Sequence, residues 1–267
     1  DPDPKFNLDE TVESDFPIID SHQHLTEKGR GDRTFGWRDN TVDVLLRSMD
    51  QSGVSASIVQ PAGGCPDPLA LHRDIAEYSR RYRGRIYGIA SLNAKEHGPE
   101  TTRDELRRCV QDYGFVGIKF HGFSHGLDPL STLGRLYFET GLELNVPVVV
   151  CVGAHGLPFT SPGLYAQIAD EYPELDIVFA HLDYPTAQHS TYLASRYRGI
   201  FLTSSLSITH YLRDAILTAG AHKVMLGSED SASIPSEIAK VAGTGVSDEA
   251  LRQVLRETAI KVFKLAA

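Results

Sequence analysis

The chain has 267 residues, of which 41% are hydrophobic, and a formal net charge of −9. This apolar content suffices for a sizeable core and argues against a disordered chain. The acidic excess disfavours nucleic acid or an anionic membrane as a partner, and the apolar runs are too short to span a membrane. The three widely spaced cysteines (Cys65, Cys109 and Cys151) form no disulfide framework and favour a reducing, cytoplasmic location.

Short runs rich in β-branched residues recur along the chain and leave room for a helix between each pair. Several of them are continuously apolar, which is typical of parallel strands buried on both faces. The predicted strands are Pro17–Ser21, Ala56–Gln60, Arg85–Ala90, Val116–Phe120, Pro147–Val152, Asp176–Ala180, Gly199–Thr203 and Lys223–Leu226.

Helical periodicity with recognisable ends follows each predicted strand. The predicted helices are Thr41–Met49, Asp67–Arg83, Thr101–Tyr113, Ser131–Leu144, Leu164–Tyr172, Thr191–Arg198, Thr209–Ala219 and Ser247–Lys264. Eight strands alternating with eight helices predict a single (β/α)8 TIM barrel over residues 15–267, preceded by an N-terminal arm over residues 1–14. An open doubly wound sheet is the alternative, but no glycine-rich dinucleotide motif follows the first strand.

The first strand ends in a pair of histidines, His22 and His24, within Ile19-Asp20-Ser21-His22-Gln23-His24-Leu25. Alternate side chains of a strand share a face, so both imidazoles are expected on the same side. Two converging imidazoles form half of a metal site. Two surface histidines in a loop would be the ordinary alternative, but the position after a buried strand favours the metal site.

In a TIM barrel the active site lies at the carboxyl ends of the strands. Polar and titratable residues gather at those predicted ends: Lys119, His121, Cys151, His155, His181, Ser204, Glu229 and Asp230. Such a concentration at one rim indicates a functional site. For two of them a structural role is the alternative, since Lys119 could pair with a carboxylate and Cys151 could be a small buried hydrophobe.

In the order and spacing of these motifs the chain resembles the amidohydrolase superfamily, specifically its amidohydrolase-related (amidohydrolase 2) branch. The likeness rests on the strand-1 motif, on Gly117–His121, Pro147–Gly153, Phe179–Leu182 and Val224–Glu229, and on the closing helix Glu257–Leu265. The resemblance implies a divalent metal, often zinc, with His22 and His24 as ligands and His181 as the base that assists water or substrate.

Two positions depart from the family pattern, with Cys151 in place of the strand-5 histidine and Glu229 in place of the strand-8 aspartate. A metal could persist on His22, His24, Cys151 and Glu229, since thiolate is a good zinc ligand. Alternatively, His155 could supply the missing imidazole and Asp230 the strand-8 carboxylate. A third possibility is a barrel without metal.

The predicted function is therefore an amidohydrolase-like reaction on a small, anionic substrate, either hydrolysis of a C–N, lactone or ester bond by metal-activated water or non-oxidative decarboxylation. His181, Glu229 and Asp230 would move protons, and Lys119, His121, His155 and Ser204 would bind substrate, helped by Trp37 from the long loop Glu27–Asn40. The alternatives are a metal-free lactonase, a binuclear site bridged by a carboxylated Lys119, and a degenerate barrel with a binding role. A homo-oligomer is possible.

Overall fold

A computed structural model of the chain describes residues 16–26, 40–153, 157–183 and 186–266. Eight parallel strands follow one another around a barrel in sequence order. They are β1 (Ile18–Leu25), β2 (Val54–Pro61), β3 (Ile86–Ala90), β4 (Gly117–Phe120), β5 (Val148–Cys151), β6 (Ile177–Ala180), β7 (Ile200–Thr203) and β8 (Val224–Met225). The barrel closes between β1 and the residues after β8, where the Ser21 amide donates to the Leu226 carbonyl and Gln23 bridges to Glu229. The predicted (β/α)8 barrel is confirmed.

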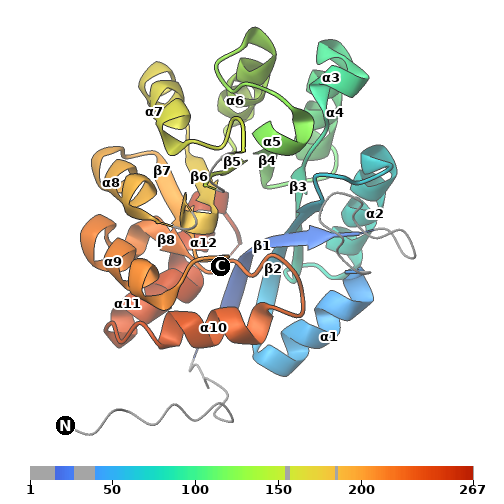
Figure 1. Cartoon of the computed structure of the whole chain (residues 1–267). Coiled ribbons are helices and arrows are strands. Elements are labelled where there is room, and N and C mark those ends of the chain that lie inside the picture. The colour runs from blue at the N-terminus through green and yellow to red at the C-terminus, as the bar shows by residue number, and fades with distance from the viewer. Residues whose placement is uncertain (1–15, 27–39, 154–156, 184–185, 267) are drawn as a thin grey trace, which may run out of the picture.

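Helices surround the strands on the outside (Figure 1). The longer ones are α1 (Val42–Ser52), α2 (Pro68–Arg81), α4 (Pro99–Gln111), α6 (Thr132–Leu144), α7 (Pro162–Glu171), α8 (Gln188–Arg196), α9 (Thr209–Ala219) and α10 (Ile234–Ala242). Shorter pieces are α3 (Ala94–His97), α5 (Gly122–His125), η1 (His181–Asp183), η2 (Ala221–Lys223), α11 (Asp248–Arg252), η3 (Gln253–Glu257) and α12 (Thr258–Phe263). Sequence periodicity did not predict α3, α5 or α10.

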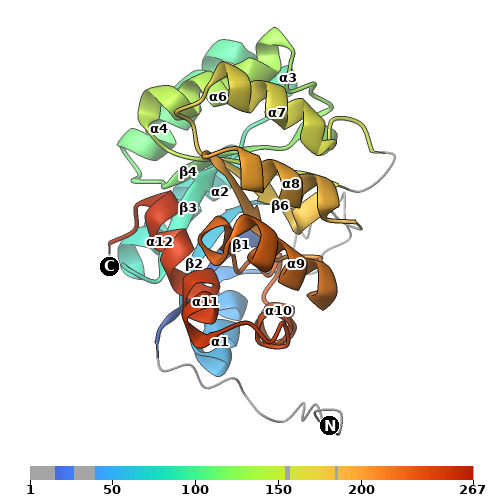
Figure 2. The same ribbon diagram turned by 90° about the vertical axis from the view of Figure 1, so that its left-hand side faces the viewer.

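Two apolar clusters divide the core. The larger one packs the outer faces of the strands against the helices. The smaller one fills the barrel interior with inward side chains such as Ile19, Val149 and Phe201, and it continues into Val262 and Phe263 of α12. The C-terminal helix thus closes one end of the barrel. Figure 2 shows α11 and α12 following one another along the barrel.

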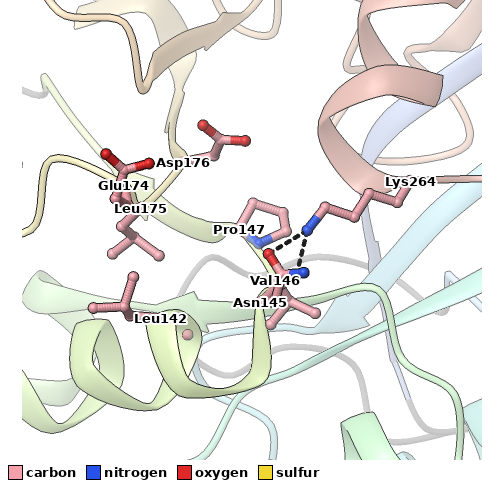
Figure 3. Close-up of a pocket in the computed structure, with 9 residues that line it drawn as sticks. Leu142, Asn145, Val146, Pro147, Glu174, Leu175, Asp176 and Lys264 are labelled. Atoms are coloured by element: carbon pink, nitrogen blue, oxygen red, sulfur yellow. Dashed lines mark hydrogen bonds between the residues drawn. The ribbon is translucent and has the colours of Figure 1, made fainter.

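At the amino-terminal ends of the strands, Lys264, which directly follows α12, binds the segment that precedes β5 (Figure 3). Its Nζ atom donates to the carbonyl and to the side-chain oxygen of Asn145, each at 2.6 Å. Asn145 ends α6 in the left-handed conformation, with φ at 55°. This contact is structural, and the carboxyl ends of the strands, where a TIM barrel places its active site, lie on the opposite face.

The predicted elements differ from the structure mainly at their ends. The first strand runs on to Leu25, so His22 and His24 lie within it, and β8 has only two residues. The predicted helix Ser247–Lys264 is interrupted by the π-helical turn η3. The predicted arm, residues 1–14, lies outside the described residues. Within the described part of the chain, no helix has the length and apolar character needed to cross a membrane.

Candidate metal centre and active site

A buried polar network holds β1 against the chain after β8. The Asp20 carboxylate accepts hydrogen bonds from the Gln23 side chain (2.9 Å), the Ser228 hydroxyl (2.5 Å) and the backbone amides of His22 and Ser228 (3.1 Å each). Burial raises the pKa of Asp20 to about 6, although these hydrogen bonds oppose the shift. The network fixes the strand-1 histidines relative to the strand-8 carboxylate.

Three imidazoles converge on the carboxylate of Glu229. His22 Nε2 lies 3.2 Å and His181 Nδ1 3.4 Å from Glu229 Oε2, while His24 Nε2 lies 3.3 Å from Oε1. The rings of His22 and His24 are 5.0 Å apart, so both face the same side, as predicted from strand alternation. His22, His181 and Glu229 each offer a donor atom within 4.8 Å of the others, and all three are enclosed by the fold.

The donor atoms of this cluster suit a divalent cation. Glu229 Oε2 is buried and has no hydrogen-bond partner in the described part of the chain, despite its nearby imidazoles. Two ligands about 2.1 Å from one tetrahedral ion are about 3.4 Å apart, close to the separations observed here. Burial alone would raise the pKa of Glu229, but His181, His22 and His24 together lower it well below its usual value. Burial lowers the pKa of His22 to about 3, which leaves a neutral imidazole able to bind metal.

Two residues of the cluster adopt a backbone conformation that is uncommon for side chains with a Cβ atom. The φ angle is 78° at His181 and 77° at Glu229. Such conformations carry a cost of order 1–3 kcal/mol and concentrate at functional sites. Gly227 allows the close approach of β1, because a Cβ atom there would lie 2.8 Å from the His22 Cβ. The backbone conformation at His181, Glu229 and Gly227 thus allows the side chains of the cluster to converge.

Gln60, the penultimate residue of β2, belongs to the cluster although sequence reasoning did not select it. Its Nε2 atom lies 3.2 Å from His22 Nε2 and 3.3 Å from His24 Nε2, and its Oε1 atom is buried without a partner among the described residues. Exchange of the amide oxygen and nitrogen would turn the oxygen toward the imidazoles. A long polar side chain directly after the apolar pair Ile58-Val59, near the end of the strand, was the available signal.

A second group lies beside this cluster inside the barrel. Cys151 Sγ is 3.6 Å from His121 Nε2. Burial alone would raise the pKa of Cys151, but His121 and Lys119 with the hydrogen bonds from His121 and His181 lower it well below its usual value. Lys119 is fully buried, and its Nζ atom makes no hydrogen bond within the described structure. Cys151 therefore interacts with His121 and His181, and Lys119 is a buried cation near it.

The remaining predicted site residues lie elsewhere. The Ser204 hydroxyl donates to Glu237 Oε2 of α10 (3.2 Å), and the neighbouring Ser205 instead lies 3.1 Å from His181 Nδ1. The Asp230 carboxylate accepts from the backbone amides of Ala232 (2.8 Å) and Ser233 (3.0 Å). The structure thus does not bring Ser204 or Asp230 into the cluster. His155 and Trp37 lie outside the described residues.

A second buried group of potential metal ligands differs from the candidate centre in its hydrogen bonding. His72, Glu105 and Cys109 also offer atoms within 4.8 Å of one another, between α2 and α4. His72 Nδ1 lies 3.0 Å from Glu105 Oε1, and its Nε2 accepts from the Ser91 amide at 3.0 Å. Arg108 binds the other Glu105 oxygen at 3.0 Å, and Cys109 contacts Glu105 Oε1 at 3.6 Å. Every donor here already has a protein partner, as in a structural hydrogen-bond network.

The fold and the rim cluster define a barrel of the amidohydrolase type, and comparison with known proteins specifies the family. The family described as "Amidohydrolase" matches residues 19–265, so the chain belongs to the amidohydrolase family. It is 24% identical to the γ-resorcylate decarboxylase of a Polaromonas species, with 84% of this chain and 87% of that protein covered. The prediction of an enzyme of this family is confirmed.

Solved structures with the same fold include a dihydroxybenzoic acid decarboxylase from Polaromonas with bound manganese and the inhibitor 2-nitroresorcinol. It superposes with a TM-score of 0.69 at 19% identity and covers 93% of this chain and 97% of its own. A 4-oxalomesaconate hydratase from Rhodopseudomonas palustris superposes with a TM-score of 0.69 at 17% identity, covering 92% and 95%. At these identities the likeness shows the shared fold.

Proposed function

We propose that this protein catalyses the metal-dependent, non-oxidative decarboxylation of a small hydroxylated aromatic carboxylate. The observation that carries the proposal is the convergence of His22, His24 and His181 on the buried Glu229 carboxylate, one oxygen of which has no hydrogen-bond partner in the described structure. The relatives named above, which include decarboxylases of dihydroxybenzoates, favour this reaction over hydrolysis.

We assign the metal to His22, His24 and Glu229. The two histidines share a strand and are almost completely buried, and each contacts a different oxygen of the carboxylate. A divalent ion held there would bind substrate oxygens and draw electrons from the aromatic ring. Manganese is present in the Polaromonas decarboxylase, so it is the first ion to test. Zinc, which the family resemblance implies, stays a prediction, and Cys151 as a further ligand does too.

Lys119 is the residue we assign to the substrate carboxylate. An ammonium group without a hydrogen-bond partner in the described structure carries a large desolvation cost in the barrel interior, which an anionic ligand would relieve. Its inward position on β4 is set by pairing with Val149, whose side chain also fills the interior. His121, at the end of the same strand, would add a hydrogen bond. Both assignments agree with the substrate-binding role predicted from sequence.

His181 is the residue we assign to proton transfer. Burial alone would lower its pKa, but Glu229 and the contact with Cys151 raise it, so the imidazole holds a proton more readily than usual. Decarboxylation needs a proton delivered to the ring carbon that carries the carboxylate. The bond to the carboxyl carbon then breaks, its electron pair restores the aromatic ring, and carbon dioxide leaves. Ser205 Oγ, 3.1 Å from His181 Nδ1, orients the ring.

The proposal is tested by mixing the purified protein, loaded with manganese or zinc, with a panel of hydroxybenzoates and measuring carbon dioxide release. We expect turnover that Glu229→Gln abolishes and that Glu105→Gln, the matched change in the other buried cluster, retains. Hydrolysis of lactones or esters by the loaded protein without carbon dioxide release would contradict decarboxylation. Full activity after chelation, with no metal bound, would favour the metal-free alternative.

Two further expectations from the sequence stay predictions. The cysteine content favours a cytoplasmic location, and barrels of this kind can pair through their outer helices. Size-exclusion chromatography with light scattering would measure the oligomeric state directly.

A further inference from the structure

Asn40 is a buried polar residue that lies between β1 and the chain after β8, and the mechanism proposed above does not use it. It is 5% exposed. Sequence reasoning named it only as the last residue of the loop Glu27–Asn40. Its side-chain amide makes four hydrogen bonds, and all of them reach the two segments that carry the assigned metal ligands.

Two of these bonds hold β1. Asn40 Nδ2 donates to the His24 carbonyl at 2.5 Å and to Gln23 Oε1 at 3.2 Å. The amide nitrogen of the same Gln23 side chain donates to Asp20 at 2.9 Å, which links Asn40 to the polar network beneath the metal centre. Asn40 therefore fixes His24 itself and the residue that lies between the two metal-binding histidines.

The other two bonds hold the chain that follows Glu229. Asn40 Oδ1 accepts from the Ser231 hydroxyl at 2.5 Å and from the Ser231 amide at 3.3 Å. Glu229, two residues earlier, has a φ angle of 77°. Such a conformation persists only where the surrounding structure enforces it, and the bonds from Ser231 to Asn40 contribute to that enforcement.

The Asn40 amide takes the place of a peptide group between two strands. The His24 amide donates to the Glu229 carbonyl at 3.0 Å, and the Glu229 amide donates to the His22 carbonyl at 2.8 Å. Asn40 continues this pairing, because it donates to the His24 carbonyl and accepts from the Ser231 amide. Only an NH₂ group can donate to a carbonyl and only an oxygen can accept from an amide, so the orientation of the side chain is unambiguous.

Closure of the loop does not account for these side-chain bonds. The backbone groups of Asn40 already pair with Thr26, the residue that precedes the loop. The Asn40 amide donates to the Thr26 hydroxyl at 2.8 Å, and the Asn40 carbonyl accepts from the Thr26 amide at 3.2 Å. These two bonds join the ends of the loop, and the side chain serves the metal-binding segments.

We infer that Asn40 is a positioning residue of the metal centre, which holds the strand of His24 and the turn after Glu229 at the separation at which both side chains bind one ion. The inference rests on the proposed function, which assigns the metal to His22, His24 and Glu229. Residues that support metal ligands in this way typically contribute about 10–100-fold to metal affinity.

The first test is Asn40→Ala, with the purified chain freed of metal by chelation and titrated with manganese, whose free concentration is followed by electron paramagnetic resonance. We expect the dissociation constant to rise about 10–100-fold. Asn145→Ala, which removes an asparagine side chain bound to Lys264 at the opposite end of the barrel, should lower the urea midpoint and leave the dissociation constant unchanged. A lower urea midpoint in Asn40→Ala with unchanged manganese affinity would overturn the inference.

Ser231→Ala is the second variant, and it removes only the hydroxyl bond to Asn40 Oδ1. It should weaken manganese binding by a smaller factor, and an unchanged affinity would overturn the inference if Asn40→Ala does not fold. Carbon dioxide release is measured separately on the wild type. Manganese binding that depends on Asn40, without any carbon dioxide release, would uphold the positioning role and refute the proposed reaction. A wild type that binds no manganese would overturn both the metal assignment and the role of Asn40.

Discussion

Two buried clusters in this barrel each bring metal-binding side chains together, but they differ in how the polar atoms of those side chains are satisfied. His72, Glu105 and Cys109 form a closed network in which each ring nitrogen, each carboxylate oxygen and the thiol has a partner. Around Glu229, by contrast, a carboxylate oxygen and the nearby Lys119 ammonium lack hydrogen-bond partners in the described structure. Unsatisfied polar atoms therefore mark the cluster around Glu229 as a binding site, whereas satisfied ones mark the other cluster as a structural network.

The largest effects are expected from substitutions that distinguish the metal ligands from the proton donor. His22→Ala should abolish metal binding, because it removes one of the three assigned ligands, and turnover should vanish with it. His181→Gln should keep one metal per chain but reduce kcat by about 10²–10⁴, the usual contribution of general acid–base catalysis. Metal analysis and steady-state kinetics measure both. Loss of metal in His181→Gln would identify His181 as a ligand and contradict the assignment.

In the closed network, Glu105→Gln should affect stability and leave chemistry intact. Burial alone would raise the pKa of Glu105, but His72 and Arg108 lower it below the usual value, so the fold relies on the charged form. Replacement should lower the free energy of unfolding by about 2–4 kcal/mol, since it disrupts a buried hydrogen-bonded pair. Urea denaturation checks this, and a changed metal content would mean that the two clusters are not distinct in function.

The buried His125 should make the protein sensitive to acid. Its pKa is about 3 in the folded state against 6.5 ordinarily, so the unfolded chain binds a proton that the folded chain does not between these values. The resulting stability is complete above pH 6.5 and is lost as pH falls toward 3, with about 2 kcal/mol lost by pH 5. Urea unfolding of His125→Phe between pH 7 and 5 should show a flatter pH dependence than the wild type, whereas His210→Phe should match it.

The smallest effect is expected at Lys119. Lys119→Met removes the cation assigned to the substrate carboxylate and should raise KM about tenfold or more. It should leave the free energy of unfolding unchanged or raise it, because the buried ammonium makes no hydrogen bond in the described structure. Kinetics and urea denaturation on the same variant test both parts. Marked destabilisation with an unchanged KM would make Lys119 a structural residue.

The barrel was predictable because its signals are local. Continuous apolar runs such as Val148–Cys151 and helices with clear ends repeat along the chain. The pair His22 and His24 followed from strand alternation alone. Side-chain directions beyond the strand ends were not predictable, because they depend on the left-handed backbone at His181 and Glu229, which no periodicity encodes.

Because side-chain direction depends on contacts that the sequence pattern does not encode, some site residues were wrongly predicted or missed from the sequence. Ser204 and Ser205 are adjacent in sequence, yet the hydroxyl of the first binds Glu237 and that of the second lies against His181. The position of α10, which was not predicted, decides this difference. Gln60 joins the centre only through the pairing of β1 with β2, a contact between segments far apart in the chain.

The most direct test of the difference between the two clusters is anomalous diffraction from a crystal soaked in manganese. We expect a peak about 2.0–2.3 Å from His22 Nε2 and from an oxygen of Glu229, with none at His72, Glu105 and Cys109. A peak in the second cluster, or none beside Glu229 in a fully soaked crystal, would contradict it.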